Sequence, residues 1–90
     1  MDLRDGRRML GAAELGALLG VSRQRVTQLT AKVWFPAPAI RLAMGAVWAL
    51  GDIQQMATET GRPLDYPALA AHLDALAERH RADPQFTRLQ

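Results

Sequence analysis

The sequence predicts one mainly α-helical domain with a small β-hairpin, on three observations. Its 90 residues, 49 % apolar and 22 % charged, suffice for one compact core and are too few for two. Apolar residues recur at helical spacing in four segments that glycine, proline or a capping residue delimits. A fifth segment, residues 35–49, instead combines prolines with strand-forming residues, which is typical of a hairpin.

The first predicted helix begins near Ala12 and ends at a glycine. Its apolar stripe is Leu15, Leu18 and Leu19. Gly20 stops it, because glycine tolerates the left-handed backbone that ends a helix. Val21 then folds back as an apolar residue, and Ser22 is a good N-cap for a second helix. We therefore expect two short helices joined by a turn of about three residues.

The second predicted helix has one apolar and one polar side. Val26, Leu29 and Val33 share the inner side, and the helix should end before Pro36 because a proline pushes the preceding residue out of helical geometry. At about 100° per residue the outer side carries polar residues with basic neighbours and no acid. These are Gln24, Thr27, Gln28 and Ala31, flanked by Arg23 and Arg25.

Residues 35–49 are predicted to form a hairpin, and two more helices are predicted to follow it. The strand-forming residues around Met44 and Gly45 are Ile40, Leu42, Val47 and Trp48. Trp34, Phe35 and Trp48 should pack the hairpin onto the helices. Asp52 is expected to open a third helix, with Ile53, Met56 and Ala57 on one face, that closes at Gly61-Arg62-Pro63.

Asp65 should cap a fourth helix running from Tyr66 to about Ala82. Along one side of this helix, residues suited to a packing contact recur at alternating three- and four-residue steps, as in a short coiled coil. This seam consists of Tyr66, Leu69, Leu73, Leu76 and His80. The seam either completes the core or pairs with a second copy. The expected division is an N-terminal arm at 1–8, a helix-turn-helix and hairpin unit at 9–62, the C-terminal helix at 63–83 and a tail at 84–90.

The net charge of +2 is unevenly distributed. Residues 7–50 carry six cations and one acid, giving +5, whereas residues 51–90 carry four cations and six acids, giving −2, and residues 1–6 give −1. The cations of the positive half are Arg7, Arg8, Arg23, Arg25, Lys32 and Arg41. Such asymmetry indicates one half that faces a polyanion.

Together these elements match a helix-turn-helix. Such a motif needs apolar inner faces, a glycine turn, a small residue at the helix crossing, here Gly16, and an exposed polar second helix. An unrelated αα-hairpin could share the glycine turn, but the succession of helix, turn, helix, hairpin and helix favours a winged helix-turn-helix with an added C-terminal helix. The outer side has the residue types that read base edges and grip phosphates.

Residues 14–29, Phe35-Pro36-Ala37-Pro38 and Gly45-Ala46-Val47-Trp48 resemble the MerR-type winged helix-turn-helix of excisionases and AlpA-like prophage regulators. The resemblance implies a second helix in the major groove, a wing on the flanking DNA, and a role in transcription or recombination of mobile elements. By position it makes Ser22, Arg23, Gln24, Arg25, Thr27 and Gln28 the groove-side residues, and assigns Arg41 and Gly45 to the wing. The chain departs from the family at the wing tip, where Leu42-Ala43-Met44-Gly45-Ala46 is apolar rather than basic.

The leading expectation is a sequence-specific regulator on double-stranded DNA, as a homodimer or a cooperative array, with RNA polymerase as a possible partner. One alternative is an excisionase that bends DNA for an integrase. Another is a protein-interaction adaptor that kept the fold, against which the acid-free outer side argues. No catalytic constellation, cofactor motif or metal spacing is recognisable, so no enzyme, cofactor or metal is expected. Without cysteine, signal peptide or membrane span, the chain is expected in the cytoplasm.

Overall fold

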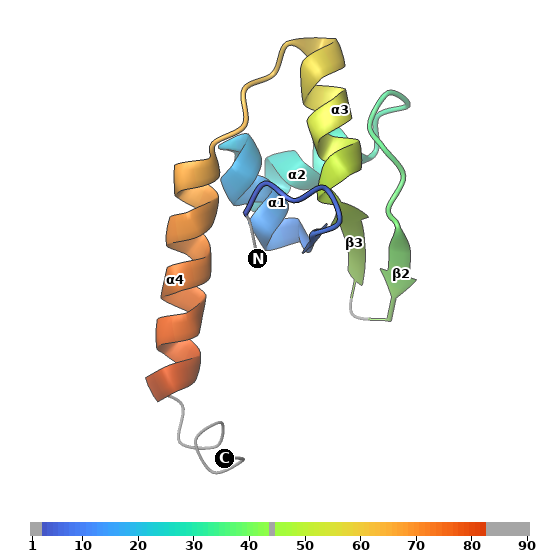
Figure 1. Cartoon of the computed structure of the whole chain (residues 1–90). Coiled ribbons are helices and arrows are strands. Elements are labelled where there is room, and N and C mark those ends of the chain that lie inside the picture. Colours follow the sequence, from blue (N-terminus) through green and yellow to red (C-terminus); the bar gives the residue numbers. More distant parts are fainter. Residues whose placement is uncertain (1–2, 44, 83–90) are drawn as a thin grey trace.

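The computed structural model describes residues 3–43 and 45–82, with the backbone alone for the last three. These residues form a mainly helical α+β fold with four helices and a three-stranded antiparallel sheet (Figure 1). The helices are α1 (Ala12–Leu19), α2 (Arg23–Thr30), α3 (Leu50–Thr60) and α4 (Tyr66–Ala82), and the strands are β1 (Met9–Leu10), β2 (Ile40–Leu42) and β3 (Gly45–Ala49). The prediction of a mainly helical fold with a hairpin is confirmed, and the structure adds one strand, β1, that was not predicted.

The turn between α1 and α2 follows the prediction. Gly20 adopts a left-handed backbone, with φ of 68°, and Ser22 Oγ accepts a hydrogen bond from the Arg25 backbone N–H at 3.2 Å. The two helices cross at Gly16. A Cβ atom there would lie 3.2 Å from both the Val21 carbonyl oxygen and Val26 Cγ2. Glycine at this position therefore sets how closely α2 approaches α1.

Replacing Gly16 with valine should lower the free energy of unfolding by about 1–3 kcal/mol, because the added atoms must push α2 away from α1. The matched control is Ala13→Val, which adds a valine to an exposed position of the same helix. Its cost should stay below about 0.7 kcal/mol, as expected from helix propensity alone. Denaturant unfolding of both variants measures the difference, and equal losses would mean that the crossing tolerates a side chain.

The prediction was wrong about the end of α2. The helix stops at Thr30, and Val33 is fully exposed (102 %) rather than part of the inner side. A turn follows in which the Lys32 N–H donates to the Leu29 carbonyl and the Phe35 N–H donates to the Lys32 carbonyl. This turn brings Phe35 into the core in the place expected for Val33.

The hairpin is present, and the sheet contains a strand that the sequence did not predict. Its order is β1-β3-β2, with Leu10 opposite Trp48 and Ile40 opposite Val47. Two of the three aromatic residues pack as expected: Phe35 and Trp48 are buried with their rings edge to face, and Trp48 Nε1 donates to the Pro36 carbonyl at 3.2 Å. Trp34 meets the prediction only in part: its ring centroid lies 6.1 Å from that of Phe35, but the residue remains 48 % exposed.

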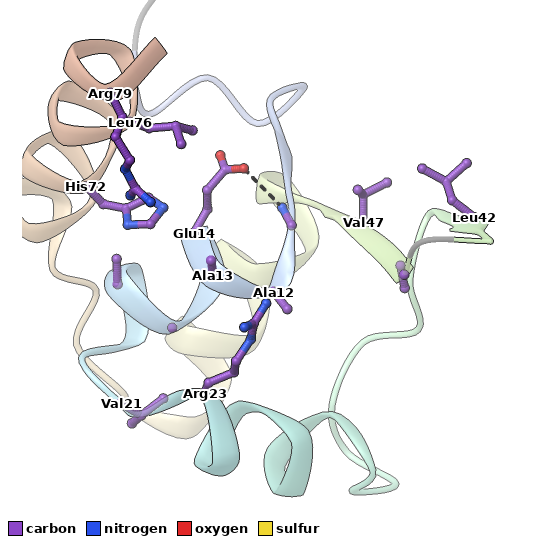
Figure 2. Close-up of a pocket in the computed structure, with 15 residues that line it drawn as sticks. Ala12, Ala13, Glu14, Val21, Arg23, Leu42, Val47, His72, Leu76 and Arg79 are labelled. Atoms are coloured by element: carbon purple, nitrogen blue, oxygen red, sulfur yellow. Dashed lines mark hydrogen bonds between the residues drawn. The ribbon is translucent and has the colours of Figure 1, made fainter. Parts of the chain in front are cut away.

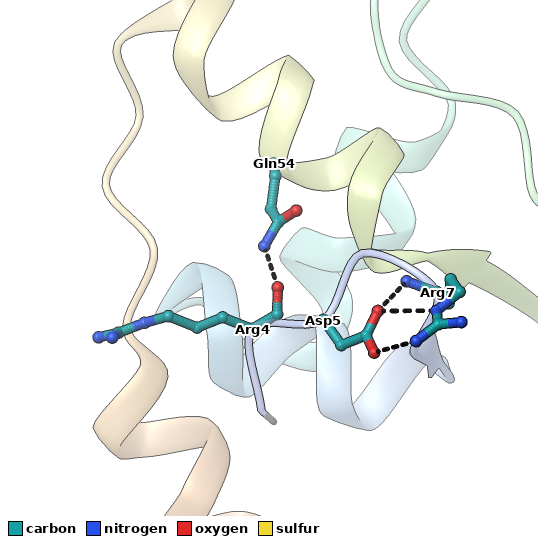
Figure 3. Close-up of polar contacts among 4 residues, drawn as sticks. All are labelled: Arg4, Asp5, Arg7 and Gln54. Atoms are coloured by element: carbon teal, nitrogen blue, oxygen red, sulfur yellow. Dashed lines mark hydrogen bonds and ion pairs between the residues drawn. The ribbon is translucent and has the colours of Figure 1, made fainter. Parts of the chain in front are cut away.

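The third helix begins at Leu50, two residues before the predicted Asp52. It starts earlier because β3 leads directly into it and the Leu50 N–H donates a hydrogen bond to the Arg8 carbonyl. Residues 3–8 lie against this start of α3. Figure 3 shows Gln54 Nε2 donating to the Arg4 carbonyl, at 2.8 Å. The same Nε2 donates to the Tyr66 hydroxyl at 3.0 Å. The described part of the predicted arm is thus tied to both α3 and α4.

The fourth helix has the predicted start and docks its first turns on α1. Asp65 Oδ1 accepts from the Ala68 N–H at 3.0 Å, and the Asp65 N–H donates to the Leu18 carbonyl at 2.7 Å. Leu69 is fully buried, and Leu73 packs partly against the core. The largest fully buried side chains of the core are Leu10, Leu15, Leu18, Leu29, Leu50, Ile53 and Leu69. In Figure 1 the later turns of α4 extend past α1, toward the end of the molecule that carries the hairpin tip.

Candidate nucleic-acid interface

The predicted groove-side residues all lie on one exposed stretch at the start and outer side of α2. Burial of Val26 and Leu29 against α1 turns the opposite side of the helix outward. No acidic residue occurs within α2. The exposed residues are Ser22, Arg23, Gln24, Arg25, Thr27 and Gln28, as predicted. We call this surface the α2 face.

Three hydrogen bonds arrange the side chains of the α2 face. The Ser22 hydroxyl caps the helix, so its oxygen is already an acceptor. The Thr27 hydroxyl donates back to the Arg23 carbonyl at 3.3 Å, which directs its hydrogen-bonding capacity toward the helix itself. Arg25 Nη1 donates to Gln28 Oε1 at 3.1 Å. The residue patterns could not reveal this last contact, which links two of the predicted groove-side residues.

Two further cations of the positive half lie just after α2 and on the hairpin. Lys32 is exposed in the turn after α2. Arg41 is exposed in the middle of β2 and pairs with Ala46, which places it on the sheet face that also carries the buried Trp48. Gly45 is exposed at the hairpin tip with φ of 138°. Met44, the apolar tip residue, lies outside the described residues.

Arg7 and Arg8, also predicted to contact DNA, lie beside the start of α3. Arg7 Nη2 contacts Asp5 Oδ2 at 3.1 Å, and the hydrogen bonds from Arg7 hold the pKa of Asp5 below its ordinary value (Figure 3). The Arg8 side chain is half-buried, and its Nε atom has no hydrogen-bond partner among the described residues. In Figure 1 this segment crosses the near side of the molecule, whereas α2 lies behind α1. The structure therefore does not gather these two arginines with the α2 face.

A groove of about 740 Å³ runs between the hairpin tip, the start of α1 and the later turns of α4 (Figure 2). We call it the α4 groove. Its polar side chains are Glu14, Arg23, His72 and Arg79, and Leu42 and Leu76 stand on opposite walls. Glu14 and Arg79 both line the groove although they are 65 positions apart in the sequence. Sequence spacing therefore gave no signal for His72 or Arg79 as site residues. Within the described residues, no three His, Asp or Glu side chains cluster as metal ligands would.

The structure divides the predicted seam of α4. Tyr66, Leu69 and Leu73 contribute to or pack against the core, as the core-completing alternative requires, while Leu76 lines the α4 groove. The side chain of His80 lies outside the described residues. Pairing with a second copy through the later turns is not tested by these contacts.

Comparisons with protein-family models, with curated proteins and with solved structures found no match. None of the helices in the described part of the chain has the length and apolar character needed to cross a membrane.

Proposed function

We propose that this chain binds double-stranded DNA sequence-specifically as a winged helix-turn-helix protein, and that it regulates transcription in a prophage or other mobile element. The observation that carries the proposal is the α2 face, where arginine and glutamine side chains are exposed with no carboxylate among them. Glutamine can pair with adenine through two hydrogen bonds, and arginine can bind guanine or phosphate. The resemblance to MerR-type regulators supports the same function.

In this proposal α2 enters the major groove and the β2–β3 hairpin is the wing. An α-helix fits the major groove, whose base edges distinguish all four base pairs. The back-bonded hydroxyl of Thr27 leaves its methyl group available for apolar contact with a thymine methyl. Lys32, just after α2, and Arg41, on the hairpin, supply positive charge for phosphates that flank the contacted bases.

Affinity for any duplex should fall steeply with salt, because phosphate contacts release counterions. If Arg23, Arg25, Lys32 and Arg41 each neutralise one phosphate, the slope of log K against log salt is about −3.6, which weakens binding about 150-fold between 50 and 200 mM salt. Fluorescence titration at several salt concentrations measures the slope. A slope near zero would overturn the proposal and favour a protein-interaction adaptor.

Footprinting on duplexes from the genomic neighbourhood of the coding sequence identifies the kind of DNA-binding protein. Because a two-fold symmetric protein binds a two-fold symmetric site, one palindromic footprint indicates a dimeric regulator. An array of direct repeats indicates an excisionase that binds cooperatively and bends the DNA.

A further inference from the structure

The α4 groove carries a positive charge that no partner within the described residues neutralises. Arg23 and Arg79 line it, and neither guanidinium group has a hydrogen bond or ion pair within the described residues. Its one acid, Glu14, is turned toward the start of α1, where Oε1 accepts from the Gly11 N–H at 3.4 Å. The two arginines and the one carboxylate of the lining together carry a net charge of +1.

The position of the α4 groove relates it to the proposed DNA contact. Arg23 is the first residue of α2, and Leu42 and Gly45 flank the hairpin tip. The groove therefore opens between the two elements that the proposed function places on DNA. A sugar–phosphate strand that passes from α2 to the wing crosses the mouth of this groove, and Arg79 on α4 stands at its opposite wall (Figure 2).

We propose that the α4 groove receives the sugar–phosphate backbone of the bound duplex, and that Arg79 is a phosphate contact contributed by α4. This inference rests on the proposed function. A polyanionic strand matches the excess of arginine charge, and Leu42 and Leu76 offer apolar surface to the deoxyribose. The C-terminal helix is then part of the DNA interface as well as a support for the core.

The first test compares Arg79→Ala with Arg62→Ala. Arg62 follows α3 and is not among the residues that line the α4 groove. Its loss changes the net charge by the same amount as the loss of Arg79. Arg79→Ala should weaken specific and random duplexes alike by roughly 3- to 10-fold at 0.1 M salt and flatten the salt slope by about one unit. Arg62→Ala should leave the slope unchanged. Circular dichroism confirms that both variants fold.

The second test keeps Arg79 in place. The chain has no cysteine, so a single substitution creates a unique attachment point for an iron–EDTA cleavage reagent. Ala75 and Ala77 are both exposed on α4, and at about 100° per residue Ala75 lies on the side of Arg79 while Ala77 points away. The reagent on Ala75→Cys should cut the DNA strand at the edge of the footprint, and the same reagent on Ala77→Cys should cut weakly.

The outcomes separate this inference from the proposed function. A wild-type slope near zero overturns both. A steep wild-type slope that Arg79→Ala leaves unchanged, or equal cutting from the two cysteine positions, overturns the groove contact alone. If Arg79→Ala keeps the slope but converts a dimer to a monomer in sedimentation, the groove holds a second copy of the chain, which also overturns the inference.

Discussion

Replacing Leu69 with alanine should lower the free energy of unfolding by about 2–5 kcal/mol, the range for truncating a buried leucine. Leu69 is fully buried where α4 docks on α1, so the truncation leaves a cavity between the two helices. A 90-residue domain has a total stability of roughly 5–13 kcal/mol, and the loss would thus be a large part of it. Urea unfolding followed by circular dichroism measures the change.

The matched control is Leu76→Ala, which makes the same truncation two turns later on the same helix. Leu76 is half-buried and lines the α4 groove, so its truncation should cost less than about 1 kcal/mol. Both losses should be independent of protein concentration if α4 completes the core. A loss that is larger for Leu76, or that grows on dilution, would show that the later turns of α4 pair two copies.

On the preferred DNA site, Gln24→Ala should cost about 1–3 kcal/mol of binding free energy, roughly a 5- to 150-fold loss of affinity, and much less on random DNA. Gln24 has no hydrogen bond to another described side chain, so its truncation removes a base reader without rearranging the α2 face. Titration against specific and scrambled duplexes measures both effects. Wild-type affinity of this variant for the specific site would mean that Gln24 does not read bases.

Arg25 and Gln28 should behave as a coupled pair, because Arg25 Nη1 donates to Gln28 Oε1. Arg25→Ala alone should weaken specific and random binding alike and flatten the salt slope by about one unit. Gln28→Ala should lose specificity and also release Arg25, so it should weaken random binding more than Gln24→Ala does. The double mutant should depart from additivity by at least about 0.5 kcal/mol. Strict additivity would show that the contact does not persist on DNA.

The sequence determined the local elements whose signals lie within a few residues. Gly20 and Ser22 delimit the turn between α1 and α2 because each acts on the backbone beside it. Asp65 starts α4 for the same reason. The helical periodicity of the apolar residues also predicted which side of α2 is exposed, because it places Val26 and Leu29 on the opposite side of the helix from Gln24 and Gln28.

Contacts between segments that are distant in the sequence could be identified only from the tertiary structure. β1 has two residues, too few for a pattern, and exists because Leu10 pairs with Trp48. Periodicity extended α2 to Val33, but the turn at Lys32 gives the core position to Phe35, whose larger ring packs against Trp48. Residue spacing measures distance along one element only, so the α4 groove, where α1, α2, the hairpin and α4 meet, was decided by packing alone.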